Sequence, residues 1–177
     1  MKTSALSSVV YGPSEDSDKE SFLVELIAAK PPTDTPWLIV GDFNMICEAR
    51  DKNNHNLNRR LMGWFRAALN TLELKDIRLQ NMQFTWSSKQ GNLILSILGR
   101  MLCNSEGDIF ISGHSLLALF TSCLDHYPLL LDPIIVEKTG AATEPLELLV
   151  HRVTGWTAGL TVSIAEPERV YIINNFS

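Results

Sequence analysis

The sequence has few cysteines, no long apolar run and no excess of positive charge. Its three cysteines, Cys47, Cys103 and Cys123, are odd in number and form no Cys-x-x-Cys pair. They have no zinc-like spacing and indicate a reducing compartment. No apolar run reaches membrane-spanning length, and the first thirteen residues contain only a short apolar stretch, which argues against a membrane span and a secretory signal. We therefore expect an intracellular protein, nuclear or cytoplasmic, that is not secreted.

The formal net charge is −5. Because Lys and Arg supply most of the nonspecific affinity for nucleic acid, this charge argues against strong nonspecific binding, and any DNA contact must be local. With 177 residues and 45% hydrophobic content, the chain is large enough for one domain with a core. Nothing in the sequence indicates an oligomeric state.

An apolar segment that ends in two polar residues is the most informative feature. Trp37 to Val40 is continuously apolar, which is typical of a strand covered on both faces, and Gly41 lets the backbone turn. Side chains two apart in extended chain share a face, so Asp42 and Asn44 should converge just past the end of the strand. In α/β folds ligands bind at this edge.

Asp125-His126 precedes a second apolar run. A carboxylate beside the one side chain that titrates near neutrality can serve proton transfer or binding of an anionic oxygen. Taken alone, the pair is more often a surface turn.

Several motifs occur in the order expected of one family: Tyr11-Gly12-Pro13, Trp37 to Ile46, Asp51-Lys52-Asn53-Asn54, Asn58-Arg59-Arg60, Phe84-Thr85-Trp86-Ser87 and Asp125-His126. Between about residues 9 and 131 the chain resembles the endonuclease domain of plant LINE-type retrotransposons. That domain belongs to the endonuclease/exonuclease/phosphatase superfamily and is related to apurinic endonucleases and DNase I. The resemblance implies an α/β fold, namely part of a DNase I-like two-sheet, four-layer sandwich.

The resemblance also implies roles for individual residues. Asp42 would activate or position the attacking water, and Asn44 would orient it. Tyr11 would donate to the scissile phosphate, and His126 would bind or protonate a phosphate oxygen. Asp125 would help to hold Mg²⁺ or Mn²⁺, which prefers oxygen ligands and needs only one or two carboxylates.

DNA is the implied partner, with weak affinity. Asn58 caps a predicted helix whose apolar residues lie between 61 and 72, and Arg59 and Arg60 at its start could hold a phosphate. The alternative is a solvated helix end. Trp86 could touch DNA, although an aromatic residue on a strand more often packs.

Three departures weaken the enzymatic interpretation. The chain begins after the segment that carries the family's upstream Asn and metal-binding Glu, so we expect an N-terminally truncated domain with apolar strand faces left uncovered. Gly99, in Ile97-Leu98-Gly99-Arg100, replaces the family's Asp that orients the catalytic His. Losing such a partner typically costs about 10–100-fold in activity. Leu124 replaces the Ser before Asp-His.

Residues 1–135 are therefore expected to form the truncated endonuclease-like domain. Residues 136–177 carry no family signature and form an unassigned tail. In this tail, the segments 160–164 and 169–173 have the pattern of a β-hairpin. The sequence leaves three functions open: a Mg²⁺-dependent DNA-nicking phosphodiesterase, a non-catalytic retroelement-derived fragment and a phosphatase of the same superfamily.

Overall fold

The computed structural model describes residues 5–88, 91–119, 126–133, 148–152, 160–166 and 169–174. Its elements follow one another along the chain as β1 (Ala5–Tyr11), η1 (Asp16–Asp18), α1 (Lys19–Ala28), β2 (Trp37–Asp42), η2 (Ala49–Asp51), α2 (Arg59–Thr71), β3 (Lys75–Asp76), β4 (Trp86–Ser87), β5 (Leu95–Ser96), β6 (Gly99–Cys103), α3 (Ser105–Phe110), β7 (His114–Ala118), β8 (Leu129–Pro133), β9 (Leu148–Arg152), β10 (Leu160–Glu166) and β11 (Arg169–Asn174). In this part of the chain, no helix has the length and apolarity needed to cross a membrane.

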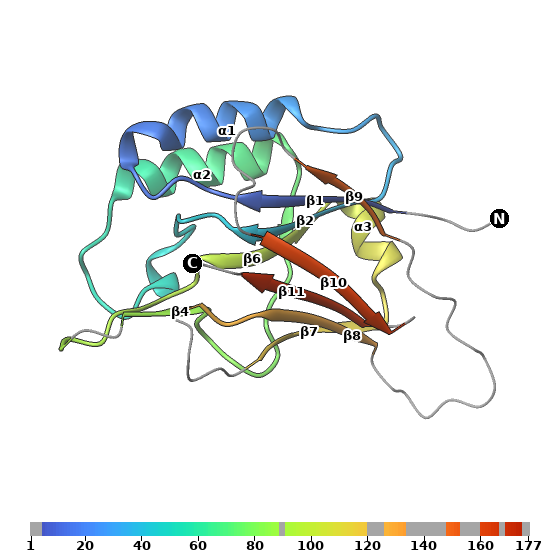
Figure 1. The fold of residues 1–177 in the computed structure, drawn as a ribbon. Helices are drawn as coiled ribbons and strands as arrows, with labels where there is room; N and C mark the ends of the chain where they lie inside the picture. The colour runs from blue at the N-terminus through green and yellow to red at the C-terminus, as the bar shows by residue number, and fades with distance from the viewer. Residues whose placement is uncertain are drawn as a thin grey trace.

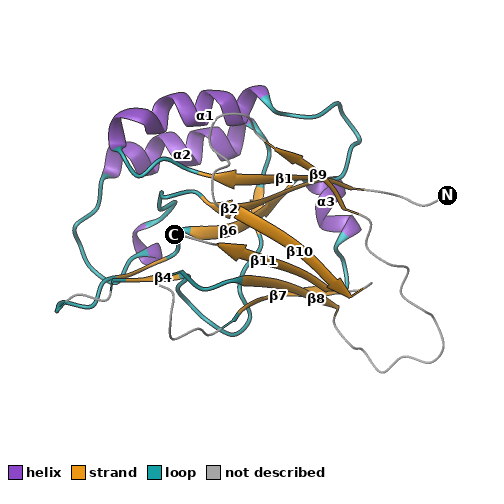
Figure 2. Ribbon diagram, viewed as in Figure 1, coloured by secondary structure: helices purple, strands orange, loops and turns teal. Residues whose placement is uncertain are grey.

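The first sheet has the strand order β3-β6-β2-β1-β9. β2 runs parallel to β1 and antiparallel to β6, and all six of its residues are buried. The strand predicted over Trp37 to Val40 is therefore confirmed. Helices α1 and α2 lie side by side over one face of this sheet (Figure 1; Figure 2).

Alternating side chains of β2 divide the core into two layers, as the period of a strand requires. Trp37 and Ile39 pack with α1 and α2. Leu38 and Val40 point to the opposite face. On the helix side, Phe43 contacts both Phe22 and Phe65, with ring centroids 6.4 and 5.4 Å away.

A second sheet covers the opposite face of the first. Its order is β10-β11-β8-β7 and its pairs are antiparallel. Leu116 and Leu131 in this sheet pack in the same buried cluster as Leu38 and Val40. The expectation of uncovered strand faces was wrong, because β7 pairs with β8 in a second sheet whose side chains pack on this face. The short apolar segment that forms β7 fits a helix or a strand equally well.

Strands from the C-terminal segment extend both sheets. β9 lies parallel to β1 at the edge of the first sheet. β10 and β11 occupy the segments for which a hairpin was predicted and pair antiparallel, and β11 also pairs with β8. The second sheet is thus built from residues on both sides of position 135.

The helix predicted to follow Asn58 is confirmed. The Asn58 side chain accepts a hydrogen bond from the Leu61 amide at 3.2 Å, which satisfies one of the unpaired donors at a helix start. The buried residues of α2 are Leu61, Met62, Phe65, Ala68 and Leu69.

Gly41 brings β1 and β2 close together. Its φ is +148°, and a Cβ at this position would lie 1.8 Å from the carbonyl oxygen of Val10. The glycine therefore serves a close approach inside the sheet, whereas the sequence suggested a turn. The chain leaves the sheet after Asp42.

Candidate functional site

Asp42 and Tyr11 lie next to each other at the carboxyl ends of two parallel strands. Tyr11 ends β1, Asp42 ends β2, and the two residues are partners in the strand register. The Gly12 amide donates to the Asp42 carbonyl at 2.6 Å, which keeps the strands paired to their ends. Asp42 is fully buried and Tyr11 is half-buried. The sheet thus places two of the predicted site residues at one edge.

Asn44 reaches this edge through a turn. Its φ is +49°, a left-handed conformation that Asn tolerates better than most residues. Its backbone amide donates to Asp42 Oδ1 at 2.8 Å, and its side-chain amide donates to the Gly12 carbonyl at 2.8 Å. The predicted convergence of Asp42 and Asn44 therefore arises from a turn, because the chain stops being extended after β2.

His126 joins the site from the segment that precedes β8. Its Nδ1 lies 3.4 Å from Asp42 Oδ2, and the exposed fractions of the two residues are only 7% and 0%. The Trp86 ring meets the His126 ring edge to face at 6.4 Å, and the two residues also form a β-bridge. Asp125, predicted to bind a metal, lies outside the described residues.

Thr85 connects separate segments of the site, a role that the sequence analysis did not predict. It is 1% exposed. Its hydroxyl oxygen accepts hydrogen bonds from the amides of Leu98 and Gly99, at 3.0 and 2.9 Å. Its carbonyl accepts from the Tyr127 amide at 2.9 Å. Thr85 thereby links the start of β6 to the segment that carries His126.

Gly99 lies directly opposite Asp42 in the β2–β6 register. The atoms nearest to a Cβ at this position would be two of Thr85, at 3.5 and 3.6 Å, and the Gly41 carbonyl oxygen at 3.9 Å, all ordinary contact distances. The site therefore has room for a side chain at position 99 and has none there. The carboxylate that the family resemblance places here is absent.

A cavity of about 260 Å³ opens beside the site. Asn44 and Trp86 both line it, together with Lys19 and Lys52 and with Asp16, whose carboxylate pairs with the Lys19 ammonium at 2.7 Å. Apolar side chains form much of the remaining lining, among them Met45, Leu61, Met62, Ile94 and Leu98. Trp86 is half-buried. Part of its side chain packs against the protein, and part has accessible surface that DNA could touch.

Arg59 and Arg60 occupy the start of α2, as predicted, and both are exposed. The Arg60 guanidinium lies over the Trp64 ring, 4.8 Å from its centroid. Neither arginine lines the cavity that contains Asn44 and Trp86. The structure brings Tyr11, Asp42, Asn44, Trp86 and His126 together and leaves the two arginines at the helix start.

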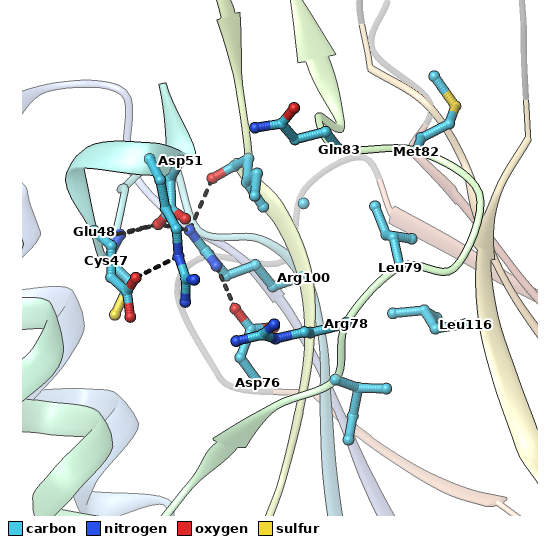
Figure 3. Close-up of a pocket in the computed structure, with 14 residues that line it drawn as sticks. Cys47, Glu48, Asp51, Asp76, Arg78, Leu79, Met82, Gln83, Arg100 and Leu116 are labelled. Carbon is cyan, nitrogen blue, oxygen red and sulfur yellow. Dashed lines mark hydrogen bonds and ion pairs between the residues drawn. The ribbon is translucent and has the colours of Figure 1, made fainter. Parts of the chain in front are cut away.

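A buried ion network lies on the other side of β6. Arg100 Nη2 is 2.5 Å from Asp51 Oδ2, and Nη1 binds Asp76. Asp51 also accepts the amides of Cys47 and Glu48. Figure 3 shows Arg100 between the two carboxylates, in the wall of a cavity of about 370 Å³. Burial opposes the charge of Arg100, but Asp76 and Asp51 outweigh it and raise its pKa.

The described residues do not by themselves form a metal site. Among them, no group of three His, Cys, Asp or Glu side chains converges. One oxygen of Asp42 accepts the Asn44 amide and the other faces His126, so the described part of the chain offers no pair of carboxylates to Mg²⁺ at this edge.

No protein-family model matches the chain, and no curated protein matches it. Its fold is that of a DNase I-like α/β sandwich, as the sequence predicts. A solved structure described as the "Endonuclease domain of TRAS1, a telomere-specific non-LTR retrotransposon" has a TM-score of 0.53 with this chain and 17% sequence identity. The match covers 72% of this chain and 56% of that chain. At this identity the likeness shows the fold alone.

Proposed function

We propose that this chain is a phosphodiesterase that nicks DNA. The observation that carries the proposal is the burial of Asp42 beside His126 at the carboxyl edge of the first sheet, where Tyr11 ends the neighbouring strand. Ligands bind at this edge in α/β sheets. The fold of a non-LTR retrotransposon endonuclease domain supports the same function, with a plant LINE-type element as the proposed origin.

Hydrolysis of a phosphodiester requires a positioned water and donors for the charge that develops on the phosphoryl oxygens. In our proposal, Asp42 and Asn44 position the water. Tyr11 donates its phenolic hydrogen to a phosphate oxygen, and His126 binds or protonates another. Tyr11 and Asp42 end β1 and β2, Asn44 follows β2, and His126 reaches Asp42 from the segment before β8.

Local contacts would hold the DNA, because the net charge of −5 disfavours a general attraction. Trp86, in the adjoining cavity, offers a ring face to a nucleotide. Lys19 and Lys52 also line this cavity, where their ammonium groups bind the Asp16 carboxylate and the Asn56 carbonyl. Arg59 and Arg60 would bind the backbone farther along. We also propose that activity requires Mg²⁺ or Mn²⁺, with Asp125 among its ligands.

The test is nicking of supercoiled plasmid by the purified chain in Mg²⁺, in Mn²⁺ and in EDTA. Asp42→Asn should abolish nicking with little change in side-chain size. Asp108→Asn is the matched control, because Asp108 is a partly exposed carboxylate on α3 whose partner is Lys75. Nicking that persists in EDTA or in Asp42→Asn would refute the proposal.

One observation favours a second function, that of a non-catalytic domain derived from a retroelement. Gly99 places no carboxylate opposite Asp42. A chain that folds cooperatively and binds DNA but does not nick it under any of these conditions would support this alternative.

A further inference from the structure

Helices α1 and α2 run parallel and in register as the outer layer of the fold (Figure 1; Figure 2). Side-chain hydrogen bonds link the two helices near both of their ends. Asn58 donates to Asp16 across 42 positions, and Lys30 donates to Glu73 across 43 positions. Each residue of α1 therefore lies beside the residue of α2 about 42 positions later, so Val24 is level with position 66.

The outward side of this layer combines a projecting valine with a row of small residues. Val24 on α1 is 62% exposed. On α2, the positions opposite the buried face hold Gly63, which is half-buried, and Ala67, which is exposed. Apart from its chain neighbours and the backbone of α2, the structure describes no atom within 4 Å of a Cβ at Gly63. In a single chain Val24 stays in water, although burial of a valine side chain is favourable.

The two helices carry opposite charges on their outward sides. α1 exposes Glu20 and Glu25, and its one basic residue, Lys19, is buried. α2 contains three arginines and no acidic residue. Within the part of the chain that the structure describes, neither Glu25 nor Arg66 forms an ion pair. An acidic strip therefore lies beside a basic strip, and the two are complementary to each other.

We propose that this two-helix face, formed by Val24, Glu25, Gly63, Arg66 and Ala67, binds the same face of a second copy of the chain. A twofold axis parallel to the helices places α1 of one copy over α2 of the other. A twofold axis across the helices would instead place α1 on α1 and α2 on α2. Like charges would then meet across the interface, which is unfavourable. The charge pattern therefore selects the axis parallel to the helices.

This axis brings specific residues of the two copies together. Rotation about it causes no shift along the helices, so Val24 of one copy lies over Gly63 and Ala67 of the other. Successive residues turn by about 100° around a helix. Glu25 therefore projects on one flank of Val24, and Arg66 projects on the opposite flank of Ala67. Because facing helices bring opposite flanks together, Glu25 of each copy meets Arg66 of the other.

Sedimentation equilibrium of the purified chain over a dilution series tests the proposal without DNA. We expect a reversible dimer. Glu25→Arg and Arg66→Glu should each raise its dissociation constant by about tenfold or more, because each brings like charges together across the interface. Glu25→Arg combined with Arg66→Glu should restore the wild-type value. Glu106→Arg is the matched control, since Glu106 lies on α3, outside the two-helix face, and it should leave the dissociation constant unchanged.

Gly63→Leu tests the apolar contact. The open Cβ position and the higher helix propensity of leucine should leave the folding of the single chain intact, as urea unfolding would show. The leucine side chain fills the place of Val24 from the other copy, so this variant should be monomeric where wild type is dimeric.

Three results would overturn the proposal. The first is a wild-type chain that is monomeric at every concentration. The second is a dimer that neither Glu25→Arg nor Gly63→Leu weakens, because the copies would then meet through another surface. The third is a double charge-reversal variant that dimerises no more tightly than the single variants, which would show that Glu25 and Arg66 do not meet.

Discussion

The two faces of β6 differ in their charge balance. Arg100 points to one face and meets two carboxylates, Asp51 and Asp76. Its neighbour Gly99 belongs to the other face, where it lies opposite Asp42, whose carboxylate faces His126. The buried ion network of Arg100 thus lies one residue along β6 from Gly99, the position in the candidate site that carries no side chain. Substitutions on this single strand can therefore test the stability of the fold and the proposed activity separately.

The largest effect on stability is expected for Arg100→Met. The substitution leaves Asp51, whose side chain is 6% exposed, as a buried carboxylate without its cation, and removing one partner of a buried pair typically costs about 3–5 kcal/mol. Urea unfolding followed by circular dichroism measures the change in the free energy of unfolding.

The matched control is Lys75→Met. Lys75 pairs with Asp108 at the surface, where ion pairs contribute little, so its unfolding midpoint should equal that of wild type. Equal midpoints for Arg100→Met and Lys75→Met would show that the buried network does not stabilise the fold.

Thr85→Val should have a smaller effect on stability, because it removes the acceptor of the Leu98 and Gly99 amides. A buried donor left without an acceptor costs about 1–3 kcal/mol. Thr85→Ser keeps the hydroxyl and should unfold close to wild type. If Val and Ser variants are equally stable, the two hydrogen bonds do not hold the start of β6.

Cys103 provides a pH-dependent test on the same strand. Its side chain is fully buried, and burial raises its pKa from 9.0 to about 11. Between these values the unfolded thiol loses its proton while the folded thiol keeps it, so stability should fall as the pH rises from about 9 to 11. The drop should be smaller in Cys103→Ala. Identical pH profiles for the two proteins would rule out this contribution.

The smallest effect is expected at the start of α2. Arg59→Ala should weaken DNA binding uniformly across sequences and reduce the slope of log K against log salt by about one, as for a single phosphate contact. Arg60→Ala should change the slope less, because Arg60 also stacks on Trp64. A slope unaffected by either substitution would identify this helix start as merely solvated.

The sequence predicted the elements whose signals are local. β2 follows from a continuous apolar run, and α2 from its Asn58 cap and apolar spacing. The β10–β11 hairpin of the second sheet was predicted, but β7 was not, because a short apolar segment near residue 116 fits a helix or a strand equally well.

The sequence also indicated the edge at which Asp42 and Asn44 would lie. It could not show that Asp42 faces His126, or that Arg100 pairs with Asp51. Both pairs join residues far apart in the chain, and only the strand registers bring them together. Thr85 was present in a recognised motif, but its hydrogen bonds to the start of β6 have no sequence pattern.

The most direct test of the central claim is the initial rate of Mg²⁺-dependent plasmid nicking by wild type and by His126→Gln, at equal concentrations of folded protein. If the site contains Asp42 and His126, wild type nicks the plasmid and the variant nicks about 100-fold or more slowly, as expected when a general acid or base is lost. The unfolding midpoint of the variant should change little. Equal rates for the two proteins would contradict the account, because the nicking would then come from elsewhere.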